Sequence, residues 1–335
     1  MKVQSGIDVS VLLLFFNRPD HFSRVWDEVR QARPARLFLY QDGPREGRHD
    51  EEGIAACREL VKDENIDWEC EVHRLYQEKN FGCDPSEYLS QQWAFSQTDK
   101  CIVLEDDDVP SQSFFTFCKD MLDRYADDGR VTLISGFNTD GRTTDVPDDA
   151  DYFFTRNFSI WGWASWSRVV LNWDGDYGFV KDGRQFETLK QKVRQYRQRK
   201  DMPAMCEAHA ATGKPYYESI FWAYMLLNDG LAIMPRVNLI SNIGFEDGTH
   251  YTSEIDLMPR RLRKQFQLPR YELPAPFDGP QNVTEFPDYQ ARHYLRNAWN
   301  NPWRKLQYSV EELLLSVKHG KWEHIWTSIK NKITK

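Results

Sequence analysis

The sequence predicts an α/β fold in which a mostly parallel β-sheet carries helices on both faces. Continuous apolar runs such as 9–16 are typical of strands buried on both faces, and they alternate with segments whose apolar residues recur at helical spacing. The alternation continues to residue 136, and strands joined by helices in this order run parallel. With 335 residues, 41% of them apolar, the chain is long enough to bury a large core.

Each predicted element rests on its own pattern. In the first helix, Phe22, Val25, Trp26 and Val29 recur at helical spacing, and Pro19 suits a first turn. The later strands are short apolar or alternating runs, and the later helices are amphipathic or apolar. The predicted strands are 9–16, 35–43, 68–76, 100–105, 130–136 and 231–245. The predicted helices are 19–32, 51–63, 86–97, 111–128, 181–200, 218–230 and one or two over 310–333.

The chain divides into two predicted parts. Residues 1–255 form the main domain, and 256–335 hold an irregular proline-containing segment and a helical C-terminal appendage. The formal charge of −8 argues against a nucleic-acid partner. The N-terminal apolar run of about eight residues is too short to span a bilayer and forms no signal peptide, so we expect a cytoplasmic protein. The six cysteines form no CxxC pair, so we expect reduced thiols.

Four consecutive carboxylates follow one strand without a linker. "CIVLEDDDVP" runs into Glu105, Asp106, Asp107 and Asp108, whose charges repel one another. The clusters "NRPD" and "QDG" end two other predicted strands, and the carboxyl ends of parallel strands share the crevice in which ligands bind. Taken alone, an acidic run is a solvated loop or a capped helix end. At this position it suits Mg²⁺ or Mn²⁺, hard cations that can hold a diphosphate.

Several segments resemble GT-A-fold glycosyltransferases, in particular N-acetylglucosaminyltransferase I and its bacterial relatives. "EDD" at 105–107, followed by "SFF", resembles the metal-binding motif of that family. "VLLLFFNRPDHFSRVWDEV", "LYQDG", "FSIWGWASW", "YYESIFW" and "NLISNIGFEDGTHYT" follow the family in the right order, over residues 9–252. The chain departs from the eukaryotic enzyme at Tyr217 and Glu218, which stand in place of Trp and Asp. No GxxxxGK[ST] or GxGxxG phosphate loop occurs.

The resemblance implies an inverting transfer of GlcNAc, GalNAc, Gal or Glc from a UDP-sugar to a hydroxyl of a glycan or lipid-linked glycan. It implies Mn²⁺ or Mg²⁺ as cofactor and a role in bacterial surface polysaccharide synthesis. Glu218 would be the general base. Asp107 would be the direct metal ligand, with His250 reaching the metal or the phosphates. The implied donor-binding residues are Arg18, Asp42, Glu105, Asp106 and Trp163.

Each assignment has a structural alternative. Asp42 is an ordinary turn residue by default, and Arg18 could pair with Asp20 or cap a turn. The tryptophans of "WGWASW" belong to cores more often than to sugar sites, and Glu218 suits the positive end of a helix dipole. For the whole protein, the alternatives are a non-catalytic nucleotide-sugar-binding subunit of a larger synthase and a nucleotidyltransferase. The latter usually has a glycine-rich loop after its first strand, which "FFNRPDHF" lacks.

The C-terminal segment 302–335 carries seven Lys/Arg against three Asp/Glu in an otherwise acidic chain. Trp322, Ile325, Trp326 and Ile329 recur on one face of a predicted helix. Basic residues beside Trp and Ile suit an anionic membrane surface, so we expect peripheral contact with the inner membrane face through this segment. The alternative is a helix packed on the main domain or on a second subunit.

Overall fold

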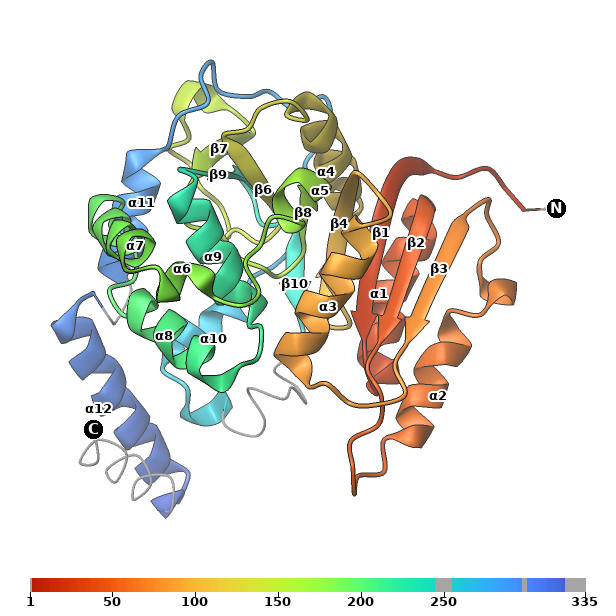
Figure 1. Cartoon of the computed structure of the whole chain (residues 1–335), viewed down its shortest axis with the longest axis horizontal. Helices are drawn as coiled ribbons and strands as arrows, with labels where there is room; N and C mark the ends of the chain where they lie inside the picture. The colour runs from red at the N-terminus through yellow and green to blue at the C-terminus, as the bar shows by residue number, and fades with distance from the viewer. Residues whose placement is uncertain (1, 245–254, 297–299, 323–335) are drawn as a thin grey trace.

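The computed structural model describes residues 2–244, 255–296 and 300–322. An eight-stranded sheet has the strand order β3-β2-β1-β4-β8-β6-β9-β7, and β5 pairs with β10 in a second, two-stranded sheet (Figure 1). The strands are β1 (Ile7–Phe15), β2 (Pro34–Gln41), β3 (Glu71–Tyr76), β4 (Lys100–Glu105), β5 (Asp108–Pro110), β6 (Val131–Ser135), β7 (Tyr152–Thr155), β8 (Trp163–Trp166), β9 (Leu231–Pro235) and β10 (Ile240–Asn242).

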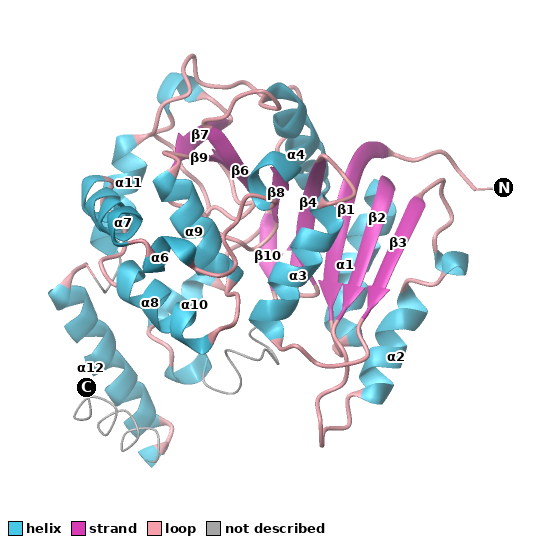
Figure 2. Cartoon of the chain, viewed as in Figure 1, coloured by secondary structure: helices cyan, strands magenta, loops and turns pink. Residues whose placement is uncertain are grey.

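Helices cover both faces of the large sheet (Figure 2). Helices α1 and α4 contact each other, and α3 contacts α5 and α9. The helices are α1 (Pro19–Ala32), α2 (Glu51–Leu60), α3 (Cys83–Phe95), α4 (Gln112–Arg124), α5 (Ser167–Val170), α6 (Gly178–Lys181), α7 (Gly183–Gln195), α8 (Met202–Thr212), α9 (Tyr217–Leu227), α10 (Arg260–Gln265), α11 (Pro287–Arg296) and α12 (Pro302–Lys318).

Most neighbouring strands of the large sheet run parallel. β1 is parallel to β2 and β4, β2 is parallel to β3, and β6 is parallel to β9, whereas β7 and β8 run antiparallel to their neighbours. Leu14 lies beside Tyr40 in β2 and beside Glu105 in β4, so three strands end at one edge. The predicted α/β fold class, with a mostly parallel, Rossmann-like sheet and helices on both faces, is confirmed.

The predicted strand over 231–245 is divided in the structure. β9 ends at Pro235, which has no N–H for a further ladder bond, and the chain leaves the large sheet there. The side chain of Asn238 then donates to the carbonyls of Ile240 and Pro269, at 2.7 and 3.0 Å. β10 pairs with β5 instead, antiparallel, so a strand from near residue 240 holds the acidic segment in place.

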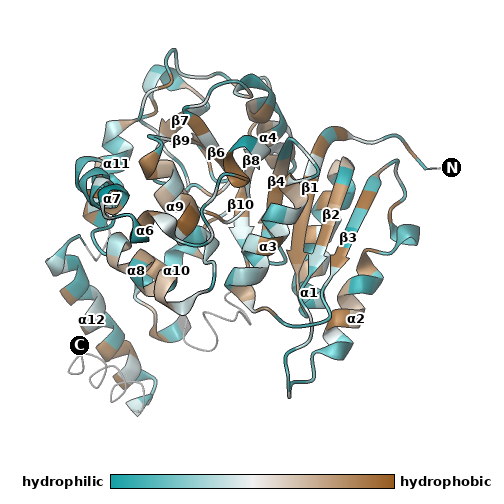
Figure 3. Ribbon diagram, viewed as in Figure 1, coloured by the Kyte–Doolittle hydropathy of each residue, from teal (hydrophilic) through white to brown (hydrophobic). Residues whose placement is uncertain are grey.

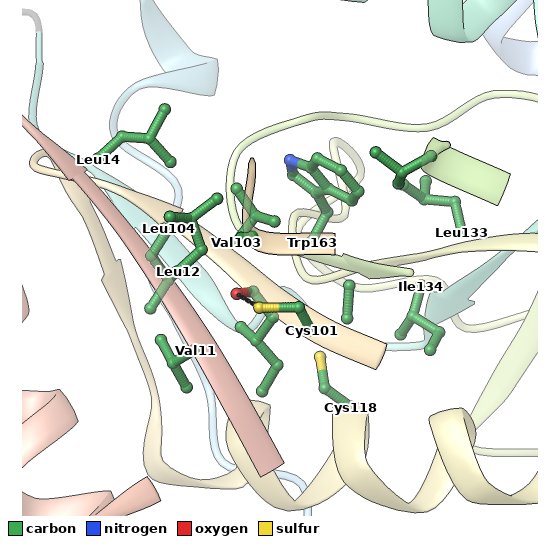
Figure 4. Packing of buried hydrophobic residues seen from close by; sticks show 14 of the residues in the cluster. Val11, Leu12, Leu14, Cys101, Val103, Leu104, Cys118, Leu133, Ile134 and Trp163 are labelled. Atoms are coloured by element: carbon green, nitrogen blue, oxygen red, sulfur yellow. Dashed lines mark hydrogen bonds between the residues drawn. The ribbon is translucent and has the colours of Figure 1, made fainter. Parts of the chain in front are cut away.

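The core lies between the sheet and its helices. Figure 4 shows Cys101 and Cys118 among aliphatic side chains of β1, β4 and β6. The six cysteines are unpaired, in agreement with the expected thiols, although Cys83 is exposed. Figure 3 shows the strands mainly hydrophobic and α7 mainly hydrophilic.

Residues 256–296 pack onto the main body. Leu273 and Phe277 belong to the main hydrophobic core, and Phe286 and Tyr289 form a smaller cluster with Phe153 of β7. An ion pair joins Glu285 to the nearly buried Arg156. This region therefore packs into the same body as residues 2–244, although the sequence placed it outside the main domain, in an irregular segment.

Helix α12 extends away from the sheet in Figure 1 and contacts the short turn at Ile255–Leu257. Its apolar side chains remain exposed, with Trp303 80% accessible. Among the helices of the described ranges, none has the length and apolarity needed to cross a membrane.

Candidate active site

The acidic segment occupies the turn between β4 and β5. Glu105 is the last residue of β4, and Asp108 is the first residue of β5, so Asp106 and Asp107 form the turn. The pairing of Asp108 with Asn242 fixes the far side of this turn. The four carboxylates thus lie where the parallel strands end, as the sequence predicted for a ligand crevice.

Arg18 forms the counter-charge of the turn. Its guanidinium donates to Oδ1 of Asp106 and, at 2.8 Å, to Oδ2 of Asp107. The backbone N–H of Phe16 also donates to Asp106, at 3.3 Å. Burial lowers the pKa of Arg18, but the two carboxylates outweigh burial and raise it, so Arg18 is a permanent cation here. The alternative pairing with Asp20 is not the one that the structure shows.

Asp108 has a structural role within the acidic segment. It is fully buried, and burial raises its pKa well above the usual range. Its Oδ2 accepts from the N–H of Gly162 at 2.8 Å, and its Oδ1 accepts from Asn242 at 3.1 Å. Gly162 has a φ of +62°, and a Cβ there would lie 2.5 Å from Ile240, so only glycine fits this approach.

Asp42 holds a backbone loop. Its carboxylate accepts from the N–H groups of Gly43, Phe81 and Gly82, at 2.9–3.1 Å. The side chain therefore ties the end of β2 to the start of α3. Asp42 thus acts as a turn residue, as its structural alternative proposed, but it also holds a loop about 40 residues further along the chain. Its contact with the donor stays a prediction.

Trp163 lies in the core and not in a cavity. Its side chain is 1% exposed and packs among Phe95, Trp173 and Phe221. Figure 4 shows it beside Val103 of β4. The predicted donor contact does not fit this position, because β8 points the ring into the layer between sheet and helices. The alternative that placed these tryptophans in the core describes Trp163 correctly.

A cavity of about 670 Å³ lies beside the acidic turn. Glu105 and Glu218 both line it, so the structure brings the strand-end acid and the predicted base into one space. Glu218 is exposed in the first turn of α9. Trp161 and Trp222 also line this space and offer aromatic surface. We call this space the acidic cavity.

Two further acids of α3, Asp84 and Glu87, line the acidic cavity. Burial, followed by repulsion from Asp84 and Glu218, raises the pKa of Glu87 to about 8. Burial and the charge of Glu87 raise the pKa of Glu105 well above its usual range. Both shifts favour the protonated form of the carboxyl group, in which it can donate a hydrogen bond to a substrate.

Sequence analysis missed Asp84 and Glu87. A signal was available, since α3 follows β3 and a helix that follows a parallel strand starts at the carboxyl edge of the sheet. Acids in the first turns of such a helix face the same crevice as the strand ends.

The described residues contain no group of three or more His, Cys, Asp and Glu side chains arranged to hold a metal ion. Asp106 and Asp107 nevertheless supply the hard oxygen donors that Mg²⁺ and Mn²⁺ accept, and such ions often use one or two carboxylates plus substrate phosphates. The donors fit the cation chemically, while Arg18 contacts both of them. His250, the other predicted metal contact, lies outside the described residues.

Comparisons with known proteins show similar solved structures but no family. No family model matches the chain, and no curated protein matches it. Mouse xyloside xylosyltransferase 1, in its apo form, is 10% identical, with a TM-score of 0.34 over 66% of this chain and 81% of that one. The inositol-1-phosphate CTP transferase from T. maritima is 10% identical, with a TM-score of 0.38 over 78% and 96%.

A UDP-glucose pyrophosphorylase complexed with UDP-glucose is 9% identical, with a TM-score of 0.30 over 50% of this chain and 81% of that one. At these scores the likenesses decide neither the family nor the activity of this chain.

Proposed function

We propose that the chain is an inverting, metal-dependent glycosyltransferase that moves a hexose or N-acetylhexosamine from a UDP-sugar to a glycan hydroxyl. One observation carries the proposal: the acidic cavity joins Glu105, at the end of the β4 strand, to Glu218 on α9. A donor sugar beside the strand ends would then lie next to a base from another element. The sequence resemblance to GT-A glycosyltransferases supports the same roles.

Glu218 would accept the proton of the acceptor hydroxyl as that oxygen attacks the anomeric carbon. Glu87 and Glu105 would donate to sugar hydroxyls in their protonated forms, and Trp161 and Trp222 would cover an apolar face of a sugar. These contacts orient the acceptor oxygen toward the anomeric carbon and displace water from it.

Asp106 and Asp107 would hold the divalent cation together with the diphosphate. When bound, the cation supplies positive charge to the leaving UDP. Arg18 already supplies positive charge at this position, so it would either share the diphosphate with the cation or leave the carboxylates when the cation binds. Asp42 and Arg18 remain the proposed contacts to the nucleotide.

The same geometry leaves a nucleotidyltransferase as the second candidate. The two activities release different products: a glycosyltransferase releases UDP, whereas a nucleotidyltransferase uses a triphosphate and releases pyrophosphate. A non-catalytic subunit would release neither.

The decisive experiment incubates the protein with a panel of UDP-sugars and Mn²⁺ and measures UDP release, with and without glycan acceptors. A Glu218→Gln variant keeps the shape of the side chain and removes its basicity, so turnover should fall about 10²–10⁴-fold while UDP affinity stays nearly unchanged. Glu207→Gln, an exposed acid on α8, is the matched control. Unchanged turnover in Glu218→Gln, or equal turnover in excess chelator, would refute the mechanism.

We further propose that the enzyme acts on bacterial surface glycans at the inner face of the membrane, with α12 as the contact. The exposed apolar residues of α12 are spaced alternately by three and four positions, which places them on one helix face. The residues with this spacing are Trp303, Leu306, Val310, Leu313 and Val317, and Leu314, next to Leu313, is exposed as well. Arg304, Lys305 and Lys318 near the helix ends would favour anionic lipid.

A further inference from the structure

A second cavity, of about 630 Å³, adjoins the acidic cavity. The two share four lining residues: Thr139, Arg199, Gln265 and His293. We call the second space the basic cavity, because its wall includes Arg199, Arg261, Lys264 and Arg296, and no Asp or Glu of the described ranges lines it.

We propose that the basic cavity binds an anionic group, a phosphate or a carboxylate, on the acceptor substrate. The inference rests on the proposed function and names its acceptor class. A chain with a formal charge of −8 gathers four cationic side chains from three segments of the sequence around this one space. Arg261 and Lys264 lie on α10, Arg296 ends α11, and Arg199 lies between α7 and α8.

Two of these cations already have carboxylate partners. Arg296 pairs with Asp140, and Arg199 pairs with Asp201. Asp140 is shared with His293, whose Nε2 lies 3.7 Å away. Burial would raise the pKa of Asp140, but the contacts with His293 and Arg296 lower it to about 2. Asp140 therefore stays ionised, and its negative charge is neutralised by these side chains of the protein.

The other two cations have no carboxylate partner among the residues that the structure describes. In the part of the chain that the structure describes, no acidic side chain lies within ion-pair distance of Arg261 or Lys264. Counted over the described ranges, the four cations and the two paired carboxylates leave a net charge of +2 on the wall, without His293. An anion that entered the basic cavity would therefore meet donors that are not already neutralised.

A basic helix is usually a solvated surface, and four of the six residues of α10 are Arg or Lys. The position of its cations argues for more than solvation. Arg261 and Lys264 are three residues apart, hence on one face of the helix, and that face lines a cavity together with Arg199 and Arg296. Arg263, on another face, pairs with Asp256 at 3.8 Å.

The two adjoining cavities suit a single acceptor molecule that has a reactive hydroxyl at one end and an anionic group at the other. Arg199 lines both spaces, and Glu218 lines the acidic one. An acceptor whose hydroxyl lies at Glu218 could extend past Arg199 and place its anion against α10. Tyr308 of α12 completes the wall, so the proposed membrane helix borders the anion site.

The test compares Arg261→Gln/Lys264→Gln with the control Arg260→Gln/Arg263→Gln, which removes two charges from other faces of the same helix. Inorganic phosphate and glucuronate are the probes, and calorimetry is done with UDP present to fill the donor site. We expect Arg261→Gln/Lys264→Gln to weaken binding of one or both probes about tenfold, since hydrogen bonds to charged groups are the stronger ones. The control should bind them as the wild type does.

Phosphate binding alone would indicate a phosphorylated acceptor, and glucuronate binding alone a uronic acid. If both variants bind the probes as the wild type does, or if Arg261→Gln/Lys264→Gln weakens UDP binding by the same factor, the basic cavity is not an acceptor site. UDP release from the UDP-sugar panel in the presence of glycan acceptors provides the independent check. If no UDP is released while probe binding still depends on Arg261 and Lys264, the proposed function fails and the anion site stands.

Discussion

Arg18 decides the charge balance of the acidic turn. It contacts Asp106 and Asp107, and Asp106 is nearly buried, so these carboxylates depend on it in the absence of a cation. Burial raises the pKa of Asp106, and Arg18 opposes that shift. The residue that the sequence assigned to the nucleotide therefore has a second role within the protein.

Replacing Arg18 by Gln should destabilise the protein by about 1–3 kcal/mol, because the charges of two carboxylates lose their partner. Mn²⁺ should recover part of that loss in Arg18→Gln, since the cation restores positive charge at the carboxylates. Urea unfolding with and without Mn²⁺ measures both effects. Arg30→Gln, an exposed position on α1, is the control, and equal stability of the two variants would contradict the role.

Glu87 should make stability depend on pH. Its pKa of about 8 in the folded protein lies above the ordinary value of 4.5. Between these two values the unfolded chain is ionised while the folded one keeps its proton, so stability should fall as pH rises from 4.5 toward 8. The slope is at most about 1.4 kcal/mol per pH unit, and lower for this half-buried side chain.

Glu87→Gln should therefore be more stable than the wild type at pH 8 and differ little from it at pH 5. Thermal unfolding at the two pH values measures the difference. Glu52→Gln, an exposed acid in α2, should show no such change. A stability gain that is the same at both pH values would mean that the effect is not one of ionisation.

At the scale of elements, helices and strands with clear local sequence signals were predicted correctly, whereas pairings between distant segments were not. The bounds of α1 match the prediction because Pro19 marks its start and four apolar residues fix its face. The sequence also placed the acidic segment at a strand end correctly. The partner of β5 was not predictable from the sequence. Asn242 pairs with Asp108, but the two are far apart in the chain, and only the folded sheet brings them together. The cavity walls of α3, α10 and α11 likewise depend on tertiary packing.

Helix α12 gives the element-scale prediction. Leu306 and Leu313 are 53% and 46% exposed, so Leu306→Glu/Leu313→Glu should leave the fold intact. Binding to anionic vesicles at low salt should fall at least about tenfold, because the variant loses apolar contact and adds negative charge. Vesicle flotation measures binding.

Gln191→Glu/Gln195→Glu on α7 makes the same change in net charge at exposed positions and serves as control. If the wild type does not float with the vesicles, the membrane proposal is dropped. Loss of a dimer in the leucine variant, measured by size exclusion, would then assign the apolar face to a second copy.

At the scale of the whole molecule, residues 256–296 complete the body that the first 244 residues begin. A chain that ends at residue 255 would lack Leu273 and Phe277 from the core, and it would leave Arg156 without its partner Glu285. We expect it to lose cooperative unfolding, since an unpaired buried charge and missing core side chains are each costly.

A chain that ends at residue 301 keeps these contacts and should unfold cooperatively. Calorimetry of the two truncated proteins beside the full-length chain tests the difference. Cooperative unfolding of the 1–255 chain would instead show that residues 1–255 fold as an independent domain, as the sequence suggested.

The contacts of the acidic turn also set an order of events during synthesis. Arg18 leaves the ribosome before Asp106 and can neutralise it at once, whereas Asp108 waits for Asn242, which is 134 residues further along. At 5–20 residues per second this interval lasts roughly 7–27 s. Throughout it, the nascent chain carries a carboxylate destined for full burial that has not yet met its amide partner. We therefore expect the buried position of Asp108 to be completed late, after most of the chain has been made.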